Sequence, residues 1–332
     1  MKKTLVAIAA LALVGAASAQ STVNLTGKFA FAYKTANDGQ GLATSKASGF
    51  EVTDGDVVFA AVEDLGGGLK AGATMAVRVR GRGALGVVNG RDATVWLAGG
   101  FGSLTGGAVE AANGIIGLGG AGAPVIGLDN GVGNAAPTAY ENAKTALDGG
   151  TNVDWLAYTT PNMGGFTGTI QMVDSLTNPG GGGLQSSAAT QDGVLVGVAY
   201  SNGPVNAKLD YTSYGLNGAA AGADNRLRIS GNYNLGVATI GAGYQTKETT
   251  TAVEDKQYIL GVAAPFGPVT VGANYTRRTQ TGGLKVTAWD LGAHYALSKR
   301  TGVQVGYQTI DSNSALVPNN VTTFRIRMLH SF

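Results

Sequence analysis

The chain alternates apolar and polar positions with a period of two over most of its length. Residues 69–82 show this pattern clearly, because one face of the stretch is apolar throughout. That face holds Leu69, Ala71, Ala73, Met75, Val77 and Val79. The opposite face holds the bases Lys70, Arg78, Arg80 and Arg82. Successive side chains of a strand point to opposite faces, so this stretch predicts a β-strand with one apolar and one basic side.

Sixteen segments of about ten residues repeat this alternation, from residues 22–34 to residues 321–332. Seven of the connections between them are tight turns and eight are longer, and the two kinds alternate along the chain. All the tight turns therefore fall at one end of the sheet. An even-stranded membrane barrel has this arrangement, with its apolar side chains facing lipid, whereas a soluble sandwich has no reason to keep it. The pattern predicts an all-β fold, a transmembrane 16-stranded antiparallel β-barrel in one domain.

Regular alternation disappears only between residues 111 and 150. The first part of this insert is almost uncharged, but it contains Pro124 and many glycines, which disfavours a membrane-spanning helix. An irregular insert of this length inside a compact domain usually has a function. We expect a loop here, either floppy or folded in.

The N-terminus has the features of a secretory signal peptide. Lys2 and Lys3 precede an apolar run at residues 5–14, and Ala17-Ser18-Ala19 offers a cleavage site. The apolar run is too short for a comfortable membrane anchor. We predict that residues 1–19 are removed and that the mature barrel domain, residues 20–332, lies beyond the cytoplasmic membrane.

Composition limits what can stabilise the chain and what it can bind. The absence of cysteine excludes disulfides and thiolate metal sites. The chain has 23 Lys and Arg against 21 Asp and Glu, and removing Lys2 and Lys3 leaves 21 against 21. The mature protein is thus neutral overall, so any electrostatic function must come from segregated charge.

Motifs for catalysis, metals or nucleic acid are lacking. The glycine-dense stretches 117–122 and 180–183 have no strand-then-helix context for phosphate binding. The two histidines, His294 and His330, have no serine that could serve as nucleophile and belong to no metal-ligand cluster. Aromatic residues occupy the face opposite the bases, unlike those of a nucleic-acid platform. We therefore expect no enzyme activity, no cofactor, no metal and no nucleic-acid partner.

Several motifs give the chain a family resemblance that covers essentially the whole mature sequence. They are Glu63-Asp64-Leu65-Gly66-Gly67-Gly68-Leu69-Lys70-Ala71, Phe101-Gly102-Ser103-Leu104-Thr105, Asn152-Val153-Asp154-Trp155-Leu156-Ala157-Tyr158-Thr159-Thr160-Pro161, Tyr200-Ser201-Asn202-Gly203-Pro204 and the terminal Phe332. With these motifs the chain resembles Gram-negative trimeric general diffusion porins, most closely those of β-proteobacteria.

The resemblance implies that residues 111–150 form the constriction loop, folded into the barrel lumen. It also implies a homotrimer in the outer membrane, in contact with lipid and lipopolysaccharide. Recognition of the C-terminal strand by the barrel-assembly machinery, with Phe332 as the signal, belongs to the same expectation. The chain departs from the family pattern at Asp56 and Ala60, where bases are usual, and at Gly107-Ala108, where Gly-Arg is common. These departures concern the width and charge of the constriction.

Basic side chains on the lumen face are the candidate functional residues, since an open pore needs only a wet lumen, a narrow point and charge there. Strand parity and height predict a contiguous basic wall of Lys28, Arg78, Arg325 and Arg327. The further pore-lining bases are Arg80 and Arg82 near the outer mouth, and Arg226 and Arg228 across the barrel. The candidate opposing acids of the loop are Asp129, Glu141 and Asp148. A basic wall in low-dielectric surroundings concentrates anions, so we predict an anion-preferring pore.

The sequence supports a channel for passive diffusion of small hydrophilic solutes and ions. The runner-up is a substrate-selective channel for phosphate or organic acids, in which the basic wall would be a binding ladder. An outer-membrane hydrolase would need a histidine–nucleophile pair, which the sequence does not supply. An adhesive or structural protein without an open pore is the third alternative.

Overall fold

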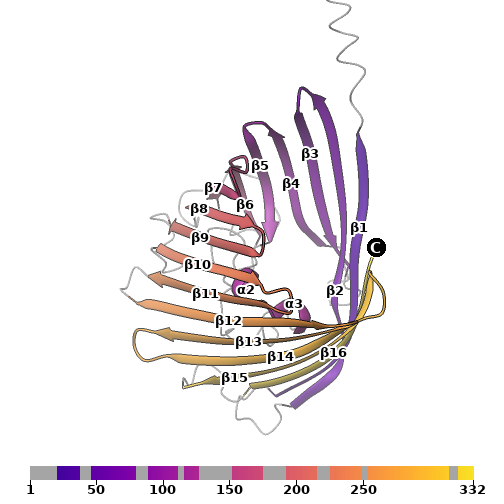
Figure 1. Cartoon of the computed structure of the whole chain (residues 1–332), viewed down its shortest axis with the longest axis vertical. Coiled ribbons are helices and arrows are strands. Elements are labelled where there is room, and N and C mark those ends of the chain that lie inside the picture. The colour runs from indigo at the N-terminus through magenta and orange to yellow at the C-terminus, as the bar shows by residue number, and fades with distance from the viewer. Residues whose placement is uncertain are drawn as a thin grey trace, which may run out of the picture.

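A closed sheet of sixteen antiparallel strands makes up most of the structure (Figure 1). This computed structural model describes residues 21–37, 46–79, 89–110, 116–126, 152–174, 192–214, 225–248, 253–313 and 321–332. Each strand pairs with its neighbours in the sequence, and the last strand pairs with the first. The predicted all-β, 16-stranded barrel is therefore confirmed.

The strand boundaries follow the predicted segments closely. The first eight strands are β1 (Thr22–Asn37), β2 (Lys46–Gly66), β3 (Leu69–Arg78), β4 (Asn89–Gly99), β5 (Gly102–Glu110), β6 (Asn152–Thr159), β7 (Phe166–Asp174) and β8 (Asp192–Asn202). The second eight are β9 (Val205–Tyr214), β10 (Asn225–Asn234), β11 (Thr239–Glu248), β12 (Glu254–Phe266), β13 (Val269–Gln280), β14 (Lys285–Ala296), β15 (Thr301–Ser312) and β16 (Val321–Ser331). Two helices of one turn each, α2 (Ile116–Gly119) and α3 (Ala123–Ile126), lie between β5 and β6 in the chain. Within the described part of the chain, no helix is long and apolar enough to cross a bilayer.

Exposure alternates along the strands in the sense opposite to that of a soluble protein. On β10, Leu227 and Ile229 are 40% and 53% exposed, whereas Arg226 and Arg228 are 1% and 4% exposed. An apolar outer face and a polar inner face suit a barrel surrounded by lipid, where every backbone polar group must be paired within the sheet. Closure also removes the open edges that such strands would otherwise present.

Exposed aromatic side chains form two bands on the outer face. Near the tight turns lie Phe101, Phe166, Tyr233, Phe266, Tyr295 and Phe332. Toward the opposite end lie Phe31, Tyr33, Phe50, Tyr211, Tyr258, Trp289, Tyr307 and Phe324. Amphipathic rings are enriched at both membrane–water interfaces, so the two bands are typical of a membrane-spanning barrel.

The tight turns depend on glycine at particular positions. The turn between β2 and β3 contains Gly66, Gly67 and Gly68 with φ of 84°, 61° and 82°, which only glycine adopts without steric cost. The Asp64 carboxylate accepts a hydrogen bond of 2.9 Å from the Gly66 N–H and so fixes the start of the turn. Three consecutive left-handed residues explain why the sequence motif has three glycines.

The barrel closes where the C-terminus meets β1. The Gly27 N–H donates to the Phe332 carbonyl and the Phe332 N–H donates to the Gly27 carbonyl, both at 3.0 Å. The Phe332 ring lies directly over Gly27, where a Cβ would come within 2.3 Å of the ring. Because Gly27 has no side chain, it leaves room for the terminal aromatic ring at the seam.

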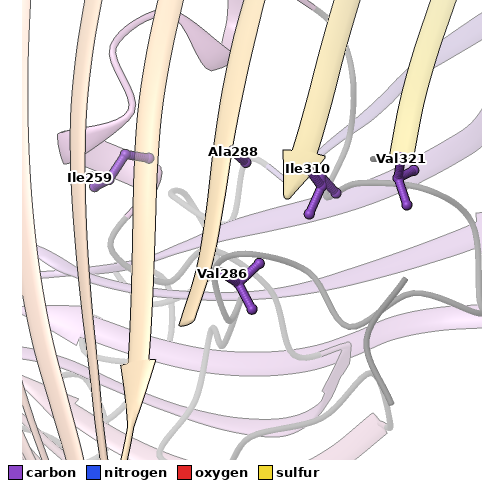
Figure 2. Packing of buried hydrophobic residues seen from close by; sticks show 5 residues of the cluster. All are labelled: Ile259, Val286, Ala288, Ile310 and Val321. Carbon is purple, nitrogen blue, oxygen red and sulfur yellow. The ribbon is translucent and has the colours of Figure 1, made fainter. Parts of the chain in front are cut away.

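The inner face is not uniformly polar. Five apolar side chains of at most 1% exposure form a cluster on the inner side of β12 and β14–β16, namely Ile259, Val286, Ala288, Ile310 and Val321 (Figure 2). Ala123 of α3 packs against this cluster. Strand parity alone assigns these positions to a wet face, but they are buried, and Ala123 and Leu284 pack against them.

Candidate pore lining

Residues 116–126 lie inside the barrel against β10–β15, which places α2 and α3 within the lumen (Figure 1). The Gly122 N–H donates a 3.0 Å hydrogen bond to the Asn274 side-chain oxygen. The Gln304 side-chain amide donates to the Pro124 carbonyl at 2.7 Å. Asn274 and Gln304 are buried on the inner face, so they hold the backbone of this segment on the wall.

Glycines on four successive strands make this close approach possible. A Cβ at Gly241 would lie 2.5 Å from the Leu118 carbonyl oxygen, and one at Gly261 would lie 2.3 Å from the Ala121 nitrogen. The next two strands repeat this at Gly272, 2.9 Å from the Gly122 carbonyl oxygen, and at Gly292, 2.8 Å from Ile126 Cα. We call Gly241, Gly261, Gly272 and Gly292 the glycine track. Any larger side chain on the track would push the segment away from the wall.

On the other side of the lumen, β2 presents three carboxylates, those of Glu51, Asp54 and Asp56. The pairing of β1 with β2 skips Thr53, so the strand contains a β-bulge there. Strict alternation would put Glu51 on the face opposite Asp54, but the extra residue brings both to the inner face. Sequence reasoning treated Asp56 only as a departure from the family pattern and missed the three acids as a group.

Asp54 joins the first and last strands. Its carboxylate accepts from Lys28 Nζ at 3.2 Å and from Arg327 Nη1 at 3.0 Å. Arg327 also donates through Nε to Gln304 Oε1 at 2.7 Å and is 4% exposed. Two of the predicted pore-lining bases therefore meet on one acid.

Asp56 holds a second pair of bases. Arg78 Nε lies 3.3 Å from one carboxylate oxygen, and Arg91 Nη1 lies 2.5 Å from the other. Arg91 is the extra residue of a bulge in β4, since the pairing with β3 skips it. The sequence reading did not include Arg91, because the bulge changes the parity at the start of this strand.

Glu51 contacts the third pair, with Lys34 Nζ and Arg325 Nη1 each 3.6 Å from its carboxylate. Asp92 lies 4.0 Å from Arg91. The whole group, which we call the charged wall, consists of the bases Lys28, Lys34, Arg78, Arg91, Arg325 and Arg327 and the acids Glu51, Asp54, Asp56 and Asp92. Six bases against four acids leave a formal charge of +2.

Arg226 and Arg228 lie on the inner face of β10, away from the charged wall. Arg226 contacts the Thr212 hydroxyl at 3.5 Å, and its guanidinium carbon lies 6.0 Å from the centre of the Tyr214 ring. Arg228 Nε donates to Gln245 Oε1 at 3.0 Å. Both guanidinium groups are thus buried and contact neutral side chains of the neighbouring strands β9 and β11.

Five predicted site residues lie outside the described residues, namely Arg80, Arg82, Asp129, Glu141 and Asp148. In the ranges that the structure describes, no group of three or more His, Asp or Glu side chains could hold a metal ion.

Comparison with protein families matches residues 4–315 to the Gram-negative porin family. Outer membrane porin protein 32 of Delftia acidovorans is 33% identical over 336 residues, which cover 91% of this chain and 88% of that protein.

Among solved structures, the anion-selective porin from Comamonas acidovorans superposes with a TM-score of 0.70 at 22% identity, covering 94% of this chain and all of that one. The trimer form of OmpT from Vibrio cholerae superposes with a TM-score of 0.63 at 12% identity, covering 94% of this chain and 99% of that one. At these identities the structural matches establish the fold.

Proposed function

The chain belongs to the Gram-negative porin family, and from this premise we propose that it forms a water-filled, anion-preferring channel for small hydrophilic solutes and ions. Family membership gives an outer-membrane location and indicates a channel rather than an enzyme. The pore-lining residues and the direction of selectivity are the parts that this proposal adds.

The observation that carries the proposal is the charge balance of the charged wall. Its six bases exceed its four acids, and each of Glu51, Asp54 and Asp56 contacts two bases. A surplus of fixed positive charge on low-dielectric walls raises the local anion concentration. The Comamonas relative is described as anion-selective, and the same preference is proposed for this chain.

We assign the narrow point to the insert of residues 111–150. The position of residues 116–126 on the inner wall supports this assignment. Asp129, Glu141 and Asp148 belong to the same insert, and their role as opposing charges stays a prediction.

Partner proposals follow from the family. We propose a homotrimer, as in the trimer form of OmpT, embedded in outer-membrane lipid and lipopolysaccharide. We also propose that the barrel-assembly machinery recognises the C-terminal strand through Phe332. Light scattering of the purified protein would give three times the chain mass for a trimer, and a single chain mass would exclude it.

Recording in a planar bilayer tests the channel directly. Purified protein is added under a KCl gradient, and the reversal potential gives the permeability ratio. We expect stepwise conductance with a reversal potential on the anion side. No conductance would exclude the channel, and a reversal potential on the cation side would exclude the selectivity.

A substrate-selective anion channel is the second candidate. Arg325 and Arg327 lie two residues apart on β16, and Lys28 shares Asp54 with Arg327, so bases occur at successive heights. Such a ladder would bind a multivalent anion while it moves. Chloride conductance that is blocked by micromolar phosphate, and phosphate current that saturates, would favour this candidate over simple diffusion.

A further inference from the structure

The outer face of the barrel also carries bases, and most of them are gathered in one place. Among strand residues whose side chains the structure describes, the outward positions hold four bases, Lys46, Lys256, Arg277 and Lys285. Three of these four lie on the adjacent strands β12, β13 and β14, near the end opposite the tight turns. A charge on the lipid face is costly at mid-depth and nearly free close to an interface. The cluster therefore lies at a depth where headgroups, rather than acyl chains, surround it.

The register of the strands makes these three bases neighbours. Arg277 pairs with Tyr258 on β12, while Lys256 and Lys285 both pair with Thr279, two residues further along β13. Each lysine is thus a diagonal neighbour of Arg277, at roughly 7–8 Å. Side chains of this length can reach one phosphate group from both sides.

Arg277 needs an acceptor that the described part of the chain does not supply. Its Nε is buried and has no hydrogen-bond partner among the described residues. Three acids lie in this region of the outer face: Glu254 contacts Lys256 at 2.8 Å, Glu248 pairs with Glu254 across β11 and β12, and Asp311 lies on β15, two strands from Arg277. The three acids balance the three bases in formal charge. Glu254 contacts only Lys256 among these bases, however, and neither Arg277 nor Lys285 forms an ion pair with a described residue. An unsatisfied buried guanidinium N–H is expensive, so an anionic ligand at this position would be stabilising.

An apolar hollow adjoins the cluster on the side of the membrane interior. Its volume is 780 Å³, and its lining includes Ile229, Ala242, Tyr244, Tyr258 and Leu260. The rings of Tyr244 and Tyr258 are stacked, with centroids 5.6 Å apart, and close the hollow toward the bases. Tyr258 borders both features, because it pairs with Arg277 and lines the hollow. Charge at the headgroup level and an apolar hollow beneath it match a phosphorylated lipid.

We propose that Lys256, Arg277 and Lys285 bind a phosphate group of outer-leaflet lipopolysaccharide, with one acyl chain of its lipid A in the hollow. The proposal rests on the outer-membrane location given above and on the usual orientation of outer-membrane barrels, in which the longer loops face the outside. The site lies on the outer face, so it is separate from the pore and from the charged wall.

Native mass spectrometry of the detergent-solubilised protein tests this site. The protein is mixed with bisphosphorylated lipid A, with dephosphorylated lipid A, or with lipid A plus excess inorganic phosphate. We expect the R277Q/K285Q variant to retain lipid A at least about tenfold less than wild type, because two charged hydrogen bonds are lost. The K46Q variant is the matched control, since Lys46 is an outward base on the distant β2, and it should retain lipid A normally.

Three results would overturn the proposal: equal retention by R277Q/K285Q and wild type, equal retention of dephosphorylated lipid A, or displacement of lipid A by inorganic phosphate. The last result would identify a site for free phosphate instead of lipid. The same preparations are recorded in bilayers without lipopolysaccharide, where R277Q/K285Q should conduct like wild type. Loss of lipid binding with normal conductance supports the site, whereas a wild type without conductance would count against the channel and leave the lipid result to stand by itself.

Discussion

The two sides of the lumen are built in different ways. On β16 and β1–β4, charged side chains project from the wall and pair with one another in the charged wall. On β11–β14, the glycine track lets the backbone of residues 116–126 lie directly on the sheet. The comparison teaches that, within one barrel, one wall can carry the fixed charge of the lumen while the opposite wall sets the width of the pore. Projecting side chains and a closely packed main chain cannot occupy the same place.

This separation gives a simple expectation for mutants. Changes on the glycine track should alter conductance, which depends on the cross-section of the pore. Changes in the charged wall should alter the reversal potential, which depends on fixed charge. Variants of the two walls show whether conductance and selectivity separate in this way.

The largest effect is expected for Gly261→Val. A Cβ at Gly261 would lie 2.3 Å from the Ala121 nitrogen, so the valine would force residues 116–126 toward the pore axis. We expect a clear fall in single-channel conductance, an unchanged reversal potential, and a destabilisation of about 1–3 kcal/mol from overpacking. The control is Gly106→Ala, since a Cβ at Gly106 meets its nearest atom only at 3.5 Å. Equal conductance of Gly261→Val and wild type would break the account of the track.

The next effect is expected for the double variant R78Q/R325Q. It removes two bases from the charged wall and changes the balance from six against four to four against four. The reversal potential should move toward the cation side, while conductance in high salt should change little. R300Q is the control, because Arg300 is exposed in the turn between β14 and β15. A shift of equal size in R300Q would mean that the wall has no special role.

Salt concentration should separate the contribution of the charged wall from that of the glycine track. Raising the ionic strength from 0.1 to 1 M shortens the Debye length from about 10 Å to about 3 Å. The anion preference of the wild type should therefore weaken as salt rises. The conductance ratio of Gly261→Val to wild type should stay constant over the same range. A ratio that varies with salt as strongly as the selectivity would contradict the assignment of width to the track.

A smaller effect is expected for Asn274→Leu. This change removes the acceptor of the 3.0 Å hydrogen bond from the Gly122 N–H, which is worth roughly 0.5–1.5 kcal/mol. Residues 116–126 should then leave the wall more often, and single-channel records should show more frequent brief closures at an unchanged open-channel conductance. Asn234→Leu, at the tight-turn end of β10, serves as the control. Identical closure frequencies in Asn274→Leu and wild type would show that this bond does not hold the segment.

The fold could be predicted from the sequence because its signal is long and repeated. Period-two alternation over sixteen segments fixes which face of each strand is apolar, and the tight turns fix how the strands are connected. The ends of individual strands were predicted less accurately. The predicted basic strand reached residue 82, whereas β3 ends at Arg78. The inner apolar cluster was also missed, since Val286 and Ile310 follow the parity of the wet face but are covered.

The site was predicted only in part, because two of its features depend on register. The bulges at Thr53 and Arg91 each add one residue to a strand, which changes the face of every side chain beyond them. Glu51 and Arg91 therefore reach the lumen in positions that strict alternation does not indicate. The glycine track has a sequence signal, since Gly241 and Gly261 pair directly, but the signal appears only when the strand pairing is known.

The acids of β2 test the central claim most directly, because a purely basic wall would not contain them. Asp54 and Asp56 each contact two bases, so D54N/D56N would raise the balance of the charged wall from six against four to six against two. The measurement is the reversal potential of this variant in a KCl gradient, beside wild type. The account predicts a stronger anion preference at nearly unchanged conductance. An unchanged reversal potential, or a shift toward cations, would contradict it.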